Sequence, residues 1–297
     1  YGLARGFNQH ISMNNPLLKD FQTPYDSAPF SIIKNEHFLP AFKASIKEAK
    51  KEIDQIVANP EPPDFENTLA VLEFSGNKLN RISSIFFNLN AAETTDEIQK
   101  IAQEVSPMLS EFANDISLNK GLFKRIAKVY EKRADLELTP EQNMLLEKNY
   151  KAFVRNGANL KEADKKVLRD IDKRKSKLGL KFGENVLAET NQYELLITDQ
   201  KNLSGLPEGV IEAARMLAED KKSDGWIFTL DYPSYIPFMT YADKRTLREK
   251  ISKAFGARGM QNNEYNNEEV VKDIVNLRHQ RAQLLGYDSH AHYVLEE

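Results

Sequence analysis

Cysteine is absent from all 297 residues of the sequence. This absence excludes disulfides and thiolate chemistry, and it removes the soft ligands of structural zinc sites. No apolar run approaches the roughly 18 residues that a membrane-spanning helix needs. The net charge is only −3, from 41 basic and 44 acidic residues, so the basic excess typical of nucleic-acid-binding proteins is missing. The hydrophobic fraction of 41% and the charged fraction of 29% are those of an ordinary globular protein.

The short motifs of hydrolases and nucleotide-binding proteins are missing as well. A helical zinc protease needs two histidines one turn apart, with a glutamate beside the first, which gives H-E-x-x-H. No histidine here is followed by glutamate, and no two are four positions apart. Neither G-x-S-x-G nor a glycine-rich phosphate-binding motif is present. The residues alone therefore assign no catalytic residue, no cofactor-binding residue and no metal ligand. The histidines are His10, His37, His279, His290 and His292.

His290 and His292 form the only close histidine pair. Side chains two positions apart can share a metal ion in a strand or loop, but they diverge on a helix. Asp288 or Ser289 is a good helix cap, so we expect the pair to diverge and to bind no metal. His37 and His279 are isolated and are expected to be surface or packing residues.

Helical periodicity dominates residues 26–191, for which we predict an antiparallel helical array. A tail over residues 1–25 precedes it, and part of this tail could be non-native. The prolines between Asn59 and Asp64 predict an extended connection. Asn67 or Thr68 is the expected N-cap of a helix that continues to Leu89. Pro107 is expected to kink or split the next helix. Other helices are predicted over 38–59, from Thr95, over 121–133, over 140–155 and over 160–186. Thr95 and Thr139 are expected helix caps, and the pair Asn156-Gly157 is expected to end the helix over 140–155.

The predicted helix over 160–186 carries nine lysines or arginines between Lys161 and Lys181, against four acidic residues. This face could form a basic track for RNA or for an acidic peptide. It could equally be a solvated helix face, which is the usual meaning of such a run. The interspersed acidic residues and the near-neutral total favour the solvated face, so no nucleic acid and no membrane is expected among the partners.

Residues 192–297 are predicted to be α-rich with a small β element. Strands are expected over 193–197 and 226–230, and together they suggest a β-hairpin element near 193–230. Residues 231–237, with two prolines, are expected to form a turn before a short helix. The remaining helices are predicted over 207–217, 243–256 and 268–285. The predicted fold class is thus mainly α, with residues 192–297 as the last of three segments.

An ordered series of short phrases resembles the N-terminal helical region of the thimet oligopeptidase (M3) family of zinc metallopeptidases. The resemblance covers residues 14–297 and is nearest to the bacterial peptidyl-dipeptidase, or dipeptidyl carboxypeptidase, branch. The phrases run from Asn59-Pro60 to Phe86-Phe87 and from Asp115 to Phe123. They continue with FVRNGANL at 153–160, FGENVLAETN at 182–191, LREKISKAFGARG at 247–259, and residues 274–293 with Arg278, Ala282 and Leu284 to Tyr287.

The resemblance implies a helical fold in which two halves flank a deep channel that admits short, unstructured peptides. The family holds zinc on H-E-x-x-H and on a further glutamate, all in its C-terminal half. No position here matches these residues. The implied reading is the N-terminal, substrate-channel part of an oligopeptidase that releases C-terminal dipeptides, with zinc in the parent protein and none bound by this chain. The implied partners are short peptides and a missing C-terminal half, and the chain alone is expected to be inactive.

Two other functions stay open at this stage. The chain could be a stand-alone helical module that binds peptides or a partner protein, or an RNA-binding protein that uses the basic face at 161–181. Residues 291–297 have helical character without a stop signal, which favours a longer parent protein. The expected location is the cytoplasm, or the periplasm if an upstream signal was removed.

Overall fold

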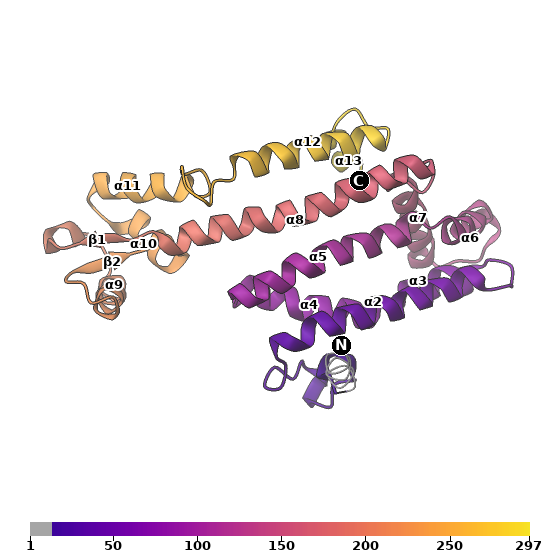
Figure 1. The fold of residues 1–297 in the computed structure, drawn as a ribbon, viewed down its shortest axis with the longest axis horizontal. Helices are drawn as coiled ribbons and strands as arrows, with labels where there is room; N and C mark the ends of the chain where they lie inside the picture. The colour runs from indigo at the N-terminus through magenta and orange to yellow at the C-terminus, as the bar shows by residue number, and fades with distance from the viewer. Residues whose placement is uncertain (1–13) are drawn as a thin grey trace, which may run out of the picture. The chain divides into compact units, whose positions relative to one another are not determined.

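The computed structural model describes residues 14–297, and most of these residues are helical (Figure 1). Their contacts divide the chain into two compact units. Unit 1 contains the residues up to 177 together with 276–297, and unit 2 contains 178–275. The predicted mainly α fold with a small β element is confirmed. The predicted segment boundaries after residues 25 and 191 stay predictions, and His10 lies outside the described residues.

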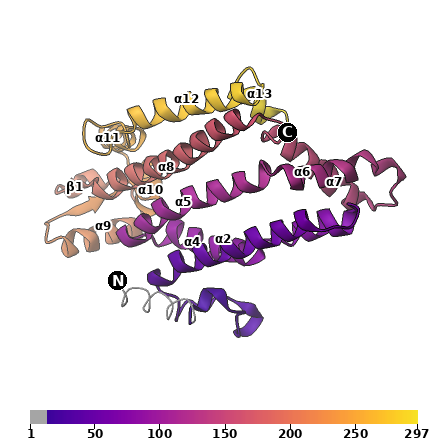
Figure 2. The same ribbon diagram turned by 45° about the vertical axis from the view of Figure 1, so that its right-hand side comes forward.

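Unit 1 begins with two short 3-10 turns and the long helix α2. Helix α2 ends where predicted, because Asn59 leaves the helical conformation before the prolines. Its buried side carries mainly apolar residues, and α2 contacts α4, α5 and α6. Figures 1 and 2 both show α2, α4 and α5 running side by side. The bounds are η1 Pro16–Leu18, η2 Pro24–Asp26 and α2 Asn35–Ala58.

The predicted start of the next helix at Asn67 or Thr68 is wrong. The helix starts at Phe65, because the Asp64 carboxylate accepts a hydrogen bond from the Asn67 backbone N–H at 2.7 Å. Asn67 returns this contact to the Asp64 N–H, which makes a reciprocal cap. The helix is also interrupted, since Gly76 has a φ of +70° before α4 begins. The bounds are η3 Phe65–Ala70, α3 Val71–Glu73 and α4 Asn77–Ala92.

The following helices have the predicted caps. The Thr95 hydroxyl accepts from the Ile98 N–H, and Thr139 forms a capping box with Gln142. The predicted break at Pro107 did not occur as a split: α5 runs through Pro107, which is buried on the apolar face. Packing of that face against α2 offsets the hydrogen bond that the proline cannot donate. The bounds are α5 Asp96–Ser117, α6 Lys120–Glu131, η4 Arg133–Asp135 and α7 Pro140–Arg155.

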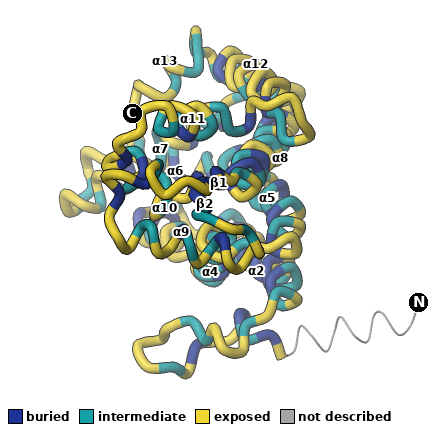
Figure 3. The backbone as a smooth tube through the Cα atoms, turned by 90° about the vertical axis from the view of Figure 1, so that its left-hand side faces the viewer, coloured by how far each residue is buried: buried dark blue, intermediate teal, exposed yellow. Residues whose placement is uncertain are grey.

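Two clusters of apolar side chains form the core of this part of unit 1. Phe86 meets Phe38 and Phe42 in edge contacts, with ring centroids 5.0 and 5.5 Å apart. A second cluster joins α2, η3, α6 and α7 around Leu122 and Ile126, which are fully buried. Figure 3 shows buried positions alternating with exposed ones along these helices, the pattern of amphipathic helices on a shared core.

The long predicted helix is present as α8, whose first part belongs to unit 1 and whose remainder belongs to unit 2. Unit 1 is completed by the end of α12 and by α13. Ser289 caps α13 by accepting from the His292 N–H, as expected. The bounds are α8 Glu162–Gln192, α12 Glu268–Leu284 and α13 His290–Leu295.

Unit 2 contains both strands, which pair antiparallel with Leu195 opposite Phe228. Helix α9 lies within the connection between them and packs on β2, so the strands are not joined by a tight turn. The predicted turn over 231–237 is wrong, because α10 begins at Tyr232. Pro233 sits in the first turn, where its missing N–H costs nothing. The bounds are β1 Leu195–Ile197, η5 Gln200–Leu203, α9 Glu208–Asp220, β2 Trp226–Phe228, α10 Tyr232–Tyr241 and α11 Arg245–Gly256.

None of the helices in residues 14–297 is both long enough and apolar enough to cross a membrane.

Candidate functional site

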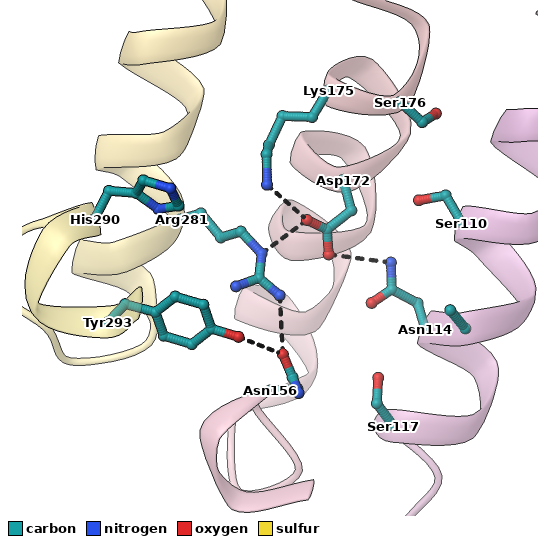
Figure 4. A pocket seen from close by; sticks show the side chains of 11 residues that line it. Ser110, Asn114, Ser117, Asn156, Asp172, Lys175, Ser176, Arg281, His290 and Tyr293 are labelled. Carbon is teal, nitrogen blue, oxygen red and sulfur yellow. Dashed lines mark hydrogen bonds and ion pairs between the residues drawn. The ribbon is translucent and has the colours of Figure 1, made fainter. Parts of the chain in front are cut away.

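A polar pocket of about 600 Å³ lies within unit 1 (Figure 4). Its walls come from α5, from the first part of α8, from the C-terminal end of α7 and from α12 and α13. Most of its lining side chains are polar, which distinguishes it from the apolar clusters of the core. The lining residues are Ser110, Ala113, Asn114, Ser117, Asn156, Asp172, Lys175, Ser176, Arg281, His290 and Tyr293.

Asp172 on α8 is the centre of the pocket's interactions. One carboxylate oxygen, Oδ1, accepts a hydrogen bond from Arg281 Nε at 2.8 Å and lies 3.8 Å from Lys175 Nζ. The other oxygen accepts from Asn114 Nδ2 at 3.4 Å. The Asp172 and Arg281 side chains are 16% and 12% exposed, so this ion pair is largely shielded from water.

Asn156 links Arg281 to α13. Its Oδ1 accepts from Arg281 Nη2 at 3.1 Å and from the Tyr293 hydroxyl at 2.8 Å. The Asn156 amide nitrogen donates to Ala152 at 2.9 Å, which fixes the orientation of this side chain on its own helix. Gly157 follows with a φ of +94° and ends α7, as the Asn156-Gly157 pair predicted.

Arg155 holds the other side of α13. Its Nε donates to Glu296 at 2.6 Å, and its guanidinium lies 4.9 Å from the centre of the Tyr293 ring. The Tyr287 hydroxyl donates to the same Glu296 oxygen at 2.6 Å. The polar cluster therefore fastens α13 to the end of α7 directly, and links it to α8 through Asn156 and Arg281.

The histidine pair does not converge. The His290 ring lines the pocket beside Tyr293, with ring centroids 6.4 Å apart, whereas His292 Nδ1 lies 2.8 Å from Ser289 Oγ. His37 Nδ1 accepts the Lys34 N–H at 3.0 Å, and His279 is exposed. Within residues 14–297 no three histidine or carboxylate side chains gather in a group that could hold a metal ion.

Positive charge is in excess around the pocket. Burial lowers the pKa of Lys175, and the nearby Arg281 lowers it further. Burial also lowers the pKa of His290, with added contributions from Arg278, Lys175 and Arg281. For Arg281 burial acts to lower the pKa, but the Asp172 carboxylate and Tyr293 outweigh it, and the net shift is upward. Among residues 14–297, Asp172 is the single carboxylate that lines the pocket.

The basic face of α8 is largely engaged in ion pairs and hydrogen bonds. Arg169 binds Asp115 at 2.6 Å, and Lys173 binds Glu111 at 2.5 Å. Lys165 is buried and donates to the Leu118 carbonyl at 3.1 Å. These contacts attach α8 to α5 and favour a structural role for its charges over an RNA track.

The sequence pattern did not single out Asp172, Asn156 or Arg281 as a group. Asn156 was recognised only as a helix-ending residue, and Asp172 only as one of four acids on a basic helix. Local signals could not have joined them, because Arg281 lies 109 residues from Asp172 and 125 from Asn156.

Comparison with known proteins gives matches along nearly the whole chain. Residues 238–297 match the model of "Peptidase family M3". Oligopeptidase A of Salmonella typhimurium is 33% identical over 284 residues, covering 94% of this chain and 41% of that protein. Dipeptidyl carboxypeptidase of Escherichia coli is 35% identical over 278 residues, covering 93% and 41%. A protein named probable cytosolic oligopeptidase A, from Arabidopsis thaliana, is 29% identical, covering 94% and 40%.

The predicted family resemblance is confirmed by these matches. The chain spans about two fifths of the length of the curated relatives that it matches. Residues of the polar pocket fall in two of the phrases that carried the resemblance, Asn156 in 153–160 and Arg281 in 274–293.

Proposed function

Because the chain belongs to peptidase family M3, we propose that it forms the substrate-channel part of a zinc-dependent oligopeptidase that hydrolyses short peptides. The observation that carries this proposal is identity of 33% to an oligopeptidase A and 35% to a dipeptidyl carboxypeptidase, each along more than nine tenths of the chain. Identity to the second relative supports release of C-terminal dipeptides as the mode of cleavage.

In this proposal the chain forms part of the wall of the substrate channel, and the rest of the parent protein contributes the catalytic residues. The zinc ligands and the glutamate that activates water would lie in sequence that the longer relatives possess beyond the matched two fifths. Zinc would act there by lowering the pKa of a bound water and by polarising the peptide carbonyl. The proposal assigns no catalytic residue, no cofactor ligand and no metal ligand to this chain.

The geometry of unit 1 suits such a supporting role. Helices α2, α4 and α5 form a layer on a shared apolar core. The polar cluster around Asp172 holds α13 against the end of α7. A catalytic site needs its supporting elements held to within a fraction of an ångström. A helix fastened by buried, charge-assisted contacts can transmit such a position to whatever sequence follows it.

The test compares the 297-residue chain with the complete natural gene product. Both are purified, supplied with zinc and incubated with a short peptide that has a free C-terminus and with the same peptide amidated. Mass spectrometry identifies the products. We expect the complete protein to release C-terminal dipeptides from the free peptide, to cut the amidated peptide poorly, and to lose activity when a chelator removes the metal.

The isolated chain is expected to release nothing under the same conditions. Zinc-dependent, chelator-sensitive cleavage by the purified 297-residue chain would contradict the proposed division of roles. Equal cleavage of the free and amidated peptides by the complete protein would retain the oligopeptidase function but replace dipeptide release with internal cleavage.

We also propose a cytoplasmic location. One relative carries the word cytosolic in its name, which supports this location. Fractionation of cells that express the natural gene product, followed by immunodetection, tests it, and recovery in the periplasmic fraction would contradict it.

A further inference from the structure

We propose that the polar pocket of unit 1 binds a small carboxylate anion, held by Lys175 and Arg281. This inference does not rest on the proposed peptidase function, since it follows from the charges and contacts of unit 1 alone. It also differs from catalysis, because a bound carboxylate here would be a ligand and not a group that reacts.

The first argument is the balance of charge. Two cations, Lys175 and Arg281, line the pocket with one carboxylate, and both rely on the same Asp172 oxygen, Oδ1. Arg278 adds positive potential from α12, as its effects on Lys175 and His290 show. The nearby Arg155 is paired with Glu296 and does not contribute a free charge. A part-buried cation without a counter-charge is costly, and a bound anion offsets that cost.

The second argument is the supply of hydrogen-bond donors. Lys175 Nζ carries three N–H groups, and within residues 14–297 its one partner is Asp172 at 3.8 Å, a long contact. Arg281 donates through Nε to Asp172 and through Nη2 to Asn156, and its guanidinium lies 5.1 Å from the centre of the Tyr293 ring. Figure 4 shows the Lys175 ammonium, the Arg281 guanidinium and the His290 ring gathered on the same side of Asp172.

The third argument selects the class of anion. The lining residues carry a net charge of one, which a carboxylate monoanion neutralises, whereas a phosphate dianion would leave negative charge beside Asp172. A planar carboxylate also matches the flat fork of an arginine. A pocket of about 600 Å³ admits a small carboxylate with its attached chain. The source is either the free C-terminus of a peptide or the side chain of an acidic residue.

Calorimetric titration of the full 297-residue chain at constant ionic strength tests the proposal with three matched probes. N-acetylglycine presents a main-chain carboxylate, and N-acetylaspartate α-amide presents only a side-chain carboxylate. The control is the diamide of N-acetylaspartic acid, in which both carboxyl groups are amidated and no carboxylate remains. Saturable heat with either carboxylate probe and none with the diamide is the expected result. The tighter of the two carboxylates identifies the source.

Variants locate the binding. We expect Lys175→Met to weaken carboxylate binding about tenfold, because it removes the charge and keeps the aliphatic stem. Lys177→Met, on the same helix but at an exposed position, should leave binding unchanged. Circular dichroism confirms that each variant is folded. The comparison of probes on the unaltered chain still decides the matter if Lys175→Met does not fold.

Two results would overturn the inference. One is carboxylate and diamide probes that give indistinguishable heats with the unaltered chain. The other is a folded Lys175→Met variant that binds the carboxylates as tightly as the unaltered chain and the Lys177→Met control.

Discussion

Substitution of Asp172 by asparagine tests whether the polar cluster stabilises unit 1. The change keeps the volume of the side chain but removes the charge that serves both Arg281 and Lys175. Breaking a fully buried ion pair costs about 3–5 kcal/mol, whereas an exposed pair contributes about 0–1 kcal/mol. The Asp172 and Arg281 side chains are 16% and 12% exposed, so the pair lies nearer the buried limit.

The asparagine oxygen can still accept a hydrogen bond from Arg281, which recovers part of the loss. We therefore expect Asp172→Asn to lower the free energy of unfolding by about 2–3 kcal/mol. Urea denaturation followed by far-UV circular dichroism measures the change. The double variant Asp172→Asn/Arg281→Met should lose less free energy of unfolding than the sum of the two single changes. In the double variant, no Arg281 cation is left buried without its ion-pair partner.

Asp170→Asn supplies the matched control. Asp170 lies on the same helix, and its partner Arg174 is 3.8 Å away with both side chains more than half exposed. This control should change the free energy of unfolding by less than about 0.5 kcal/mol. Equal effects of the Asp170 and Asp172 substitutions would refute the view that the cluster around Asp172 is the polar anchor of unit 1.

Two further predictions concern helix geometry and pH. Gly157→Ala should destabilise unit 1 by about 1–3 kcal/mol in the same urea assay, because Gly157 has a φ of +94° and a Cβ there would lie 2.7 Å from Leu160. Gly183→Ala, in an open helical position, should instead stabilise by about 0.5–1 kcal/mol. Because the pKa of Lys175 is lowered in the folded protein, the unfolded chain binds more protons between that lowered pKa and 10.5, and stability relative to Lys175→Met should rise with pH in this window. Parallel pH slopes for the two proteins would contradict this assignment.

Local signals predicted much of the fold because their partners are close in the chain. Thr95, Thr139 and Ser289 each cap a helix by bonding to an N–H three residues away, so the sequence contains both members of the contact. The same locality explains the error at Asn67. Asp64 and Asn67 are both good caps, and reciprocal hydrogen bonds between them place the helix start at the earlier one.

Proline rules were less reliable where tertiary packing intervened. Pro107, where a kink or split was expected, lies inside α5, and Pro237, where a turn was expected, lies inside α10. Each removes one backbone N–H donor, and in both cases the helix continues past the proline. The burial of Pro107 and the packing of its helix against α2 and α4 compensate for the missing hydrogen bond. Such compensation depends on a partner helix distant in the chain, so a proline alone cannot reveal it.

The polar pocket could not be predicted from local sequence patterns, and the reason is stronger than for the prolines. Its polar cluster joins residues from α5, α8, α12, α13 and the end of α7. The charges on α8 look alike in sequence whether they face water, an ion-pair partner or a pocket. The structure separates these cases: Lys173 faces Glu111 across an exposed ion pair, whereas Lys175 shares Asp172 with Arg281 in a part-buried site. Because the two lysines differ by only two positions, about 200° around the helix, their distinct roles follow directly from helical geometry. The surplus charge at Lys175 is therefore a property of the fold, and it makes this lysine, and not the basic run as a whole, the position where a ligand should be sought.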